Sequence, residues 1–575
     1  MTTGRAAMGM VVLAALALAG CGRGAGGTAQ NEERRTAVRN ALQNAAHGRP
    51  VFVSADKEGE RLWRQAREFY QARNFEPAWI DETSARPQLN ELVDALQHAD
   101  REGLDPSLYG ASTLAARRDE ASRGFVTKKG FNESEAVALD VWLTYLYLQY
   151  SSDLADGLSD LSHADPAWQI KPEPFDARRH LEDALRQNRV AKSLQELTSR
   201  DPEYAGLRNA LSRYRDIAAH GGWPRVPDDV RVKPGQRNPA IPIVAKRLAV
   251  TDDYTGQVND ADTAYGPALE EAVRRFQRRH GLEPDGTLGA AVLHEMNVPV
   301  ETRIQQLQLN LERWRWLPRE LGDRHILVNI PEYRLEVWDR ARVPVAMRVV
   351  VGKKDTPTPI FSDEMTHVIF SPYWNVPPSI VEKETLPAVM RDPGFLERTN
   401  MEVIDASGNR VDPQTIDLNE PAKYRFRQKP GTANSLGLVK FMFPNQYNVY
   451  FHDTPAESLF ARATRSFSHG CVRLEQPKAL AEYVLRDQPE WTPERIDAAM
   501  HAGEERTVKL RSPIPVYLGY WTARVTPDGL VQFRSDVYGI DDRLAARLAD
   551  RLARLKARAA AAASAANAAA KPPRM

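Results

Sequence analysis

YFHDTPAESLFARATRSFSHGCVRLE, residues 450–475, is the stretch around which the rest of the chain is organised. It contains Cys471, one of only 2 cysteines in the sequence, with His469 just before it and His452 further upstream. A free thiol has a pKa of about 8.5 and only the thiolate is the nucleophile, so the sulfur needs a group that takes its proton or stabilises its charge. An imidazole does either. The pattern therefore predicts a cysteine acyl-transfer site.

The segment after His469 is typical of a tight turn that enters a strand. Gly470 permits a positive φ or a close approach beside the nucleophile. In an extended chain, side chains two positions apart share a face, so we expect Arg473 on the same side as Cys471. Its guanidinium is suited to a bidentate hydrogen-bonded contact with a substrate carboxylate.

Simpler interpretations of the same residues stay open. A single cysteine in a folded domain is most often a small buried hydrophobic residue, and Arg473 is equally suited to a structural ion pair. Zinc sites use about three or four protein ligands, whereas only His452, His469 and Cys471 lie near one another in this stretch. We predict neither a metal nor a cofactor.

The order of these residues resembles the signature of the L,D-transpeptidases, whose catalytic domain is of the YkuD type. It consists of a His, a spacer, Ser-His-Gly-Cys, a hydrophobic residue and Arg. The resemblance implies that Cys471 is the acylated nucleophile, that His452 is the general base, and that the backbone carbonyl of Asp453 orients this imidazole. It also implies catalytic roles for His469 and Gly470, and substrate contacts from Ser468, Arg473, Tyr450 and Asn434.

The N-terminus has the features of a targeting segment. Arg5 supplies a positive charge, and residues 6–19 form an apolar run that is too short to span a bilayer. The end of this run, Leu18-Ala19-Gly20-Cys21, resembles a bacterial lipoprotein cleavage box. The box implies a signal peptide over 1–20 and lipidation of Cys21, while an ordinary cleaved signal peptide is the alternative.

Two expectations follow for the mature chain. Residues 21–50 are polar and rich in small side chains, which predicts a flexible tether. Gly22 is not acidic, and by resemblance to lipoprotein sorting this places the protein in the bacterial periplasm, anchored by lipid to the outer rather than the inner membrane.

Length and composition limit the other possibilities. The chain has 575 residues, which favours about three or four domains. Hydrophobic residues make up 42%, enough for buried cores, and charged residues make up 27%. With 77 Lys and Arg against 76 Asp and Glu the net charge is +1, and nothing in this balance indicates nucleic-acid binding.

The first half of the chain has helical periodicity. In residues 51–232 apolar side chains such as Leu62, Ala66 and Phe69 recur at helical spacing, and FYQARNFEPAW and GLDPSLYG resemble the scaffold domain of the large, YcbB-like branch of the family. We expect the tryptophans of this region to be packing residues rather than a sugar-binding platform. These are Trp63, Trp79, Trp142 and Trp168.

Residues 233–299 resemble a three-helix peptidoglycan-binding domain. A helical pattern ends at Gly281 and an Asp-Gly turn precedes a second helix. A domain kept only for packing is the alternative. We expect its arginines, Arg274, Arg275, Arg278 and Arg279, on a solvated face.

Residues 300–522 are predicted to form the catalytic domain. HILVNIPEYRLEVWD and VPVAMRVVVG alternate as the strands of a hairpin. Residues 379–438 are too long for a structureless loop, so we expect a folded insertion with a helix over 380–391. In the YcbB-like branch this insertion is a lid that excludes water from the acyl-enzyme.

Residues 523–575 are predicted to form a hairpin and a C-terminal tail. Leu544, Leu548, Leu552 and Leu555 recur at helical spacing before an alanine run. We expect a surface helix that frays at its end, with a partner-binding helix as the alternative.

The predicted fold class is α+β multidomain. It combines a mainly β YkuD-type catalytic domain with an inserted lid, an all-α scaffold and a small three-helix peptidoglycan-binding domain. The resemblance implies a peptidoglycan L,D-transpeptidase, an acyltransferase that removes the terminal D-Ala of tetrapeptide stems and forms 3→3 cross-links. A cysteine L,D-carboxypeptidase that uses water, and a non-catalytic wall tether, are the alternatives. Expected partners are the stem peptides and glycan, the membrane through lipidated Cys21, and other wall-synthesis proteins.

Overall fold

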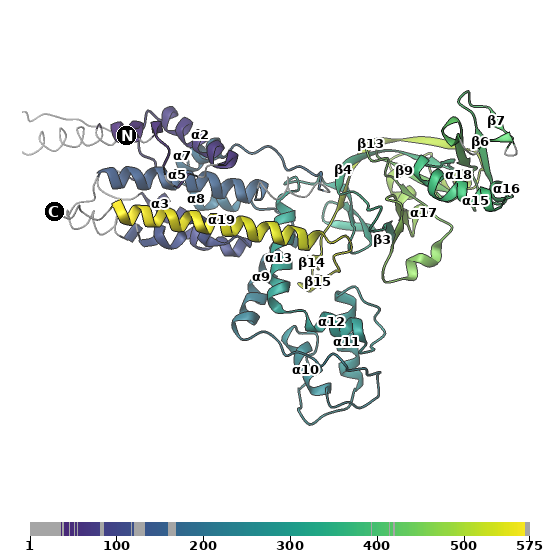
Figure 1. Ribbon diagram of the computed structural model, residues 1–575, viewed down its shortest axis with the longest axis horizontal. Coiled ribbons are helices and arrows are strands. Elements are labelled where there is room, and N and C mark those ends of the chain that lie inside the picture. The colour runs from purple at the N-terminus through teal and green to yellow at the C-terminus, as the bar shows by residue number, and fades with distance from the viewer. Residues whose placement is uncertain are drawn as a thin grey trace, which may run out of the picture.

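The computed structural model describes residues 36–569 except 37–38, 45, 51, 54–55, 81–85, 117, 120–132, 159–167, 393, 413–414 and 418–419. The predicted signal peptide and Cys21 lie outside the described residues. A helical arm forms one end of the elongated molecule, a large sheet lies in the middle and the inserted segment lies at the other end, while a small helical unit projects to one side (Figure 1).

The arm is built from amphipathic helices around one core. Its longest N-terminal helix, α5, is apolar on several faces and is surrounded by other helices. Trp63, Trp79 and Trp168 are buried in this core, as predicted, and Trp142 is partly buried against it. The helices are α2 (Lys57–Ala72), α3 (Pro87–Gln97), η1 (Ala99–Glu102), η2 (Pro106–Tyr109), α5 (Glu133–Asp156), α7 (Ala177–Arg186), α8 (Val190–Gln195) and α9 (Pro202–Ala219).

Part of the predicted tether is ordered structure. Residues 39–44 and 46–47 are helical, and Leu42 is fully buried in the core of the arm. The indole of Trp63 donates to the carbonyl of Gly48 (3.1 Å). The prediction of a flexible segment as far as residue 50 is therefore wrong over this part, because the apolar side chain of Leu42 finds a packing site.

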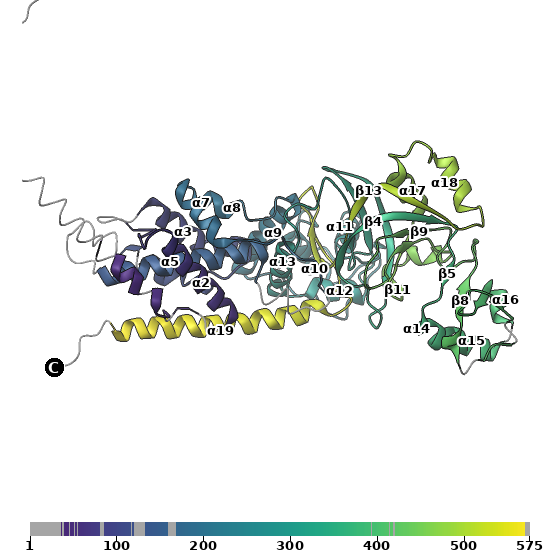
Figure 2. The same ribbon diagram turned by 90° about the horizontal axis from the view of Figure 1, so that it is seen from above.

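The C-terminal tail forms the helix that the spacing of its leucines predicted. Helix α19 (Ile540–Ala569) lies along the arm (Figure 2), where its Arg551 pairs with Asp153 of α5 (3.9 Å). Leu544 is buried, and Leu548, Leu552 and Leu555 pack against the same core. Lys556 pairs with Asp105 (2.8 Å). The leucine stripe thus docks this surface helix on the scaffold.

The projecting unit contains α10 (Ile241–Val250), α11 (Pro267–Arg279) and α12 (Ala290–Asn297) around a core of its own. Gln277 binds the predicted Asp-Gly turn through hydrogen bonds to Asp285 and Gly286. Arg279 is buried in an ion pair with Asp253 (2.5 Å), so it does not belong to the predicted solvated face.

The central sheet has nine strands and closes on itself, because β3 pairs with both β12 and β2. Helix α13 (Val300–Arg315) leads into it, and α17 (Pro477–Leu485) and α18 (Pro493–Met500) follow the catalytic segment. The strands are β1 (Arg324–Asn329), β2 (Arg334–Asp339), β3 (Arg342–Gly352), β4 (Phe361–Phe370), β9 (Val439–Met442), β10 (Phe451–His452), β11 (Ser466–Ser468), β12 (Val472–Leu474) and β13 (Arg506–Gly519).

The insertion is a folded unit with a hydrophobic core that includes Val381, Leu396, Val403 and Phe426. The predicted helix is present as α14 (Pro378–Ile380), a π-helical turn η3 (Val381–Thr385) and α15 (Leu386–Arg391), followed by α16 (Phe395–Arg398). A four-stranded sheet was not predicted; its strands are β5 (Trp374–Asn375), β6 (Met401–Ile404), β7 (Arg410–Val411) and β8 (Arg425–Gln428).

A small hairpin, β14 (Ala523–Val525) and β15 (Val531–Phe533), joins the sheet to α19. Together these units confirm the predicted α+β class, with a helical scaffold, a small helical unit and a β-rich domain that carries an insertion. In the part of the chain that the structure describes, no helix is both long and apolar enough to cross a bilayer.

Candidate active site

Strand alternation separates a buried face from a functional face at the predicted site. Phe441, Phe451 and Val472 are register partners on β9, β10 and β12, and all are fully buried. The next row across the same strands is therefore on the opposite face, and it consists of Lys440, His452 and Arg473.

Cys471 and Tyr450 also lie on this functional face, two residues before Arg473 and His452 respectively. The backbone N–H of Val472 donates to the carbonyl of Tyr450 (3.2 Å), which continues the parallel pairing of β10 and β12 toward Cys471. Side chains alternate along a strand, so Cys471 shares the face of Arg473 and lies diagonally from His452.

The imidazole of His452 is held in one tautomer. Its Nδ1 lies 2.6 Å from the backbone carbonyl of Asp453, the contact that the family resemblance implies. A carbonyl only accepts hydrogen bonds, so Nδ1 carries the proton and Nε2 keeps its lone pair. Burial and then the nearby Arg473 lower the pKa of His452 to about 3, so the ring is a neutral base at physiological pH.

The thiol of Cys471 is protonated at rest. The residue is partly exposed, yet the protein around its sulfur raises the pKa of the thiol to about 11, mainly by burial. The hydroxyl of Tyr450 and the charge of Arg473 act in the opposite direction. Sγ also lies 3.8 Å from the carbonyl of Asn448. The site therefore holds a neutral thiol and a neutral imidazole, not a preformed ion pair.

The turn before Cys471 has the conformation expected of glycine. Gly470 has φ +120°, in the region that other residues rarely adopt. Ser468 holds the turn, since its hydroxyl donates to the carbonyl of Cys471 (2.5 Å) and accepts from the N–H of Gly470 (3.1 Å). Ser468 is buried and these two bonds engage its hydroxyl in holding the turn, while its contact with substrate stays a prediction.

Two cations flank His452 without an anionic partner. Among the described residues, neither Arg473 nor Lys440 forms an ion pair, and the buried Nε of Arg473 has no hydrogen-bond acceptor. The ammonium of Lys440 lies 6.0 Å from the centroid of the Tyr450 ring. Sequence reasoning did not assign a role to Lys440, because its position beside His452 depends on the pairing of β9 with β10.

His469 connects the catalytic turn to the insertion. Its Nε2 donates to the carboxylate of Glu384 on the π-helical turn η3 (2.7 Å). Both side chains are partly exposed at this contact. The sequence contained no local signal for Glu384, because the pair joins segments that are distant in the chain.

Asn434 has all its polar groups bound inside the protein. Its amide donates to the carbonyls of Pro372 (3.0 Å) and Lys429 (2.9 Å), its side-chain oxygen accepts from the N–H of Leu436 (2.7 Å), and it is buried. This residue fixes the return of the insertion into β9, and its contact with substrate stays a prediction.

The carboxylate of Asp453 supports the same junction. It accepts from the N–H groups of Leu438 (2.8 Å) and Thr454 (2.7 Å). Gly437 leaves the required space, because a Cβ there would lie 2.3 Å from the Asp453 carboxylate. The backbone of Asp453 thus contacts His452 while its side chain anchors the strand end.

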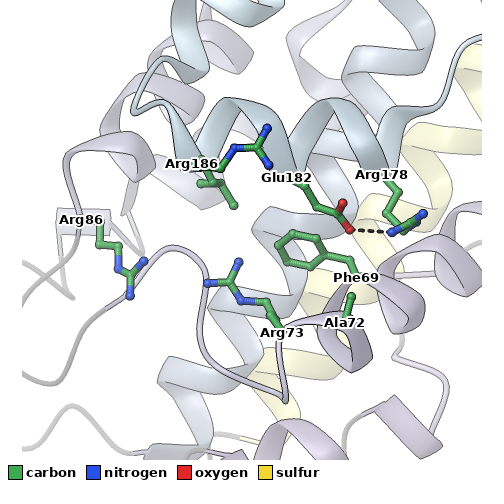
Figure 3. Close-up of a pocket in the computed structure, with 8 residues that line it drawn as sticks. Phe69, Ala72, Arg73, Arg86, Arg178, Glu182 and Arg186 are labelled. Carbon is green, nitrogen blue, oxygen red and sulfur yellow. Dashed lines mark hydrogen bonds and ion pairs between the residues drawn. The ribbon is translucent and has the colours of Figure 1, made fainter.

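A separate cavity of about 410 Å³ lies in the helical arm, between α2 and α7 (Figure 3). Its arginines are largely engaged within the protein: Arg178 pairs with Glu182 (2.6 Å), Arg73 donates to the carbonyl of Pro77 (3.0 Å), and Arg186 pairs with Asp183. It contains no nucleophile. In the described part of the chain, no group of three or more His, Cys, Asp or Glu is arranged to hold a metal ion.

Three family models match separate parts of the chain. Residues 323–507 match the YkuD family, described as "L,D-transpeptidase catalytic domain". Residues 64–211 match "Scaffold domain", and residues 238–296 match "Putative peptidoglycan binding domain".

A curated protein from Haemophilus influenzae (strain ATCC 51907 / DSM 11121 / KW20 / Rd), named "Putative L,D-transpeptidase", is 34% identical over 245 residues. The match covers 42% of this chain and 49% of that protein, so the chain spans about half the length of this relative.

Solved structures were matched as well. An L,D-transpeptidase from Mycobacterium smegmatis is 15% identical, with 34% of this chain and 58% of that chain covered and a TM-score of 0.17. L,D-transpeptidase 1 of Mycobacterium tuberculosis is 16% identical, with 34% and 60% covered and a TM-score of 0.15. Superpositions with such scores carry no argument about this fold.

The sequence matches confirm the family resemblance that began at the Ser-His-Gly-Cys motif. The chain contains a YkuD L,D-transpeptidase catalytic domain, joined to a scaffold domain and a peptidoglycan-binding domain.

Proposed function

We propose that the protein is a peptidoglycan L,D-transpeptidase that forms 3→3 peptide cross-links through a thioester on Cys471. One observation carries the proposal: a thiol, an imidazole with a free Nε2, and two unpaired cations share one face of adjoining strands. These are the parts that acyl transfer from a carboxylate-bearing peptide requires.

In the first half-reaction His452 acts as a general base. Nε2 takes the proton of the Cys471 thiol while the sulfur attacks the carbonyl that precedes the terminal D-Ala of a tetrapeptide stem. Because the thiol has a high pKa and the imidazole a low one, the proton moves during attack and not before it. The tetrahedral intermediate collapses, the D-Ala amine leaves with the proton from His452, and a thioester remains.

The second half-reaction regenerates the thiol. A side-chain amine of a second stem attacks the thioester carbonyl, and His452 removes the amine proton and returns it to the leaving sulfur. The new amide is the cross-link. Arg473 and Lys440 are suited to a carboxylate of the donor peptide, because they are the unpaired cations beside the reacting groups.

The test is to incubate the purified protein with tetrapeptide muropeptides and to weigh the products by mass spectrometry. We expect cross-linked dimers and a transient adduct on Cys471, both absent from Cys471→Ala. Products consisting only of shortened stems would assign a carboxypeptidase that uses water. Unchanged substrate with a well-folded wild-type protein would support the non-catalytic tether.

We also propose that the protein is a periplasmic lipoprotein, anchored through Cys21 to the outer membrane. The cleavage-box sequence Leu18-Ala19-Gly20-Cys21 and the non-acidic Gly22 support this. Metabolic labelling with an alkyne fatty acid should mark the wild-type protein and not Cys21→Ala, and membrane fractionation should place the labelled protein in the outer membrane. A Cys21→Ala protein with unchanged label would contradict the anchor.

We propose that the three-helix unit holds the enzyme on glycan. The match of residues 238–296 to a peptidoglycan-binding family supports this. The full chain should sediment with insoluble sacculi, and a chain lacking the unit should stay in the supernatant. Equal sedimentation of both would assign the unit to packing.

A further inference from the structure

The peptide bond that precedes the nucleophile is held from one side by a buried hydroxyl. Thr358, on the loop between β3 and β4, donates from its side chain to the carbonyl of Gly470 (2.8 Å). Thr358 is 1% exposed, so water does not compete for this bond. The oxygen of the same hydroxyl accepts from the N–H of Gly352 (2.9 Å).

This bond also sets the direction of the N–H of Cys471. The carbonyl of Gly470 and the N–H of Cys471 belong to one planar peptide unit, in which they point in opposite directions. Fixing the carbonyl toward Thr358 therefore aims the N–H away from it. Among the described residues this N–H has no hydrogen-bond acceptor, so it is free to bind a substrate oxygen.

Thr358 is itself held by a residue from far along the chain. The hydroxyl of Tyr538 accepts from the backbone N–H of Thr358 (3.2 Å) and donates to the carbonyl of Gly352 (2.8 Å). Gly352 allows this close packing, because a Cβ there would lie 2.2 Å from the carbonyl oxygen of Thr356. The loop thus has little freedom to move while Tyr538 is in place.

Tyr538 precedes α19 and lies beyond residue 507, where the match to the catalytic family ends. Its backbone N–H donates to the hydroxyl of Tyr520 (2.9 Å), which in turn donates to Asp536 (2.5 Å). The segment that leads to the scaffold-docked helix therefore reaches back to the nucleophile turn.

We propose that Thr358 and Tyr538 are positioning residues that aim the N–H of Cys471 at the oxyanion of the acyl-transfer intermediate. The proposal rests on the proposed function only in that Cys471 attacks a carbonyl. Removing one oxyanion donor typically lowers the rate by about 10²–10³-fold, so misdirecting this donor should lower acylation by about tenfold or more.

The test compares two reactions of Cys471. p-Nitrophenyl acetate acylates the sulfur through a tetrahedral oxyanion, whereas iodoacetamide alkylates it by displacement of iodide without one. Thr358→Val removes the hydroxyl, and Thr358→Ser keeps it as the conservative rescue. We expect Thr358→Val to slow release of p-nitrophenolate by about tenfold or more and to leave the alkylation rate unchanged, and Thr358→Ser to restore acylation.

Tyr538→Phe provides a second, independent variant and should act in the same direction with a smaller loss. Its matched control is Tyr517→Phe. Tyr517 is as buried as Tyr538 and also donates to a backbone carbonyl, that of Leu321 (3.3 Å), but in the described part of the chain its hydroxyl forms no hydrogen bond with the Thr358 loop. If Thr358→Val fails to fold, Tyr538→Phe and Thr358→Ser decide the question.

Equal slowing of acylation and alkylation would overturn the proposal, because a purely structural defect affects both. Unchanged acylation in folded Thr358→Val and Tyr538→Phe would also overturn it. Neither assay uses a wall peptide, so failure of the proposed transpeptidase activity would not be mistaken for failure of this inference.

Discussion

Arginine is used in opposite ways at the scaffold junction and at the active site. At the junction Arg524 of β14 lies between Glu203 of α9 (2.8 Å), Glu332 (2.9 Å) and Glu336 (3.3 Å). At the site Arg473 and Lys440 have no carboxylate partner among the described residues. Paired charges hold two units of the molecule together, whereas unpaired charges next to a nucleophile leave a place for a charge that the substrate brings.

The two arrangements differ in their energetic cost. A buried cation without an anionic partner loses hydration and gains no Coulomb energy, which destabilises the folded state. Another interaction, such as one with a bound anion, must offset this cost. Burial accordingly lowers the pKa of Arg473. Burial also acts to lower the pKa of Arg524, but the charges of Glu203, Glu332 and Glu336 outweigh it, and the pKa of Arg524 is raised. The contrast predicts that substitutions at the active site lower activity and that substitutions at the scaffold junction lower stability.

The largest expected effect is that of Cys471→Ala, which removes the thiol beside the unpaired cations Arg473 and Lys440. Acyl transfer should fall by at least about 10⁴-fold, because no other nucleophile is available to form the intermediate. Steady-state turnover of tetrapeptide substrate measures this loss, and an unchanged melting temperature shows that folding is retained. Substantial residual turnover would mean that the cations serve a different reaction.

The next effect is expected at the junction. Arg524→Gln leaves Glu203 and Glu332 buried with one charge partner fewer, which should reduce the free energy of unfolding by about 3–5 kcal/mol. Urea denaturation checks this value, and turnover per folded molecule should stay unchanged. Arg334→Gln, which breaks a more exposed pair with Glu336 (2.7 Å), is the control and should cost no more than about 1 kcal/mol.

Arg473→Gln should show the reverse pattern. Loss of a charge-assisted contact of about 1.5–3 kcal/mol predicts a decrease in kcat/KM of about 10–10²-fold. The melting temperature should stay the same or rise, because a desolvated cation is removed. A drop in stability without a change in kcat/KM would show that Arg473 is a structural residue after all.

The smallest effect concerns the protonation of the thiol. Because burial raises the pKa of Cys471 to about 11, the rate of alkylation by iodoacetamide should increase about tenfold per pH unit through the neutral range. Arg473 opposes this rise in pKa, so Arg473→Gln should move the profile to still higher pH. A plateau near neutral pH would reveal a preformed thiolate and contradict the neutral pair.

The sequence was sufficient for features that depend on neighbouring residues. Helical spacing grouped Leu62, Ala66 and Phe69, which are buried, and Ser-His-Gly-Cys identified the nucleophile turn with its glycine. The hydrogen-bond partner of the His452 imidazole could also be predicted, because the Asp453 carbonyl belongs to the next residue in the chain.

Features that depend on strand order and docking were not predictable in this way. Lys440 meets His452 only because β9 pairs with β10, and Glu384 meets His469 only because the insertion folds over the turn. The burial of Asn434 was not predictable for the same reason, since its hydrogen-bond partners lie on segments whose approach no local pattern indicates.

The docking of α19 on the helical arm has a practical consequence. The ordered segments nearest the two ends of the chain both belong to this arm, and the insertion that contacts the catalytic turn lies at the opposite end of the molecule (Figure 1). A resin, biosensor chip or fluorophore coupled to this arm would therefore attach far from the insertion, which favours the arm for immobilisation in kinetic measurements with bulky wall fragments.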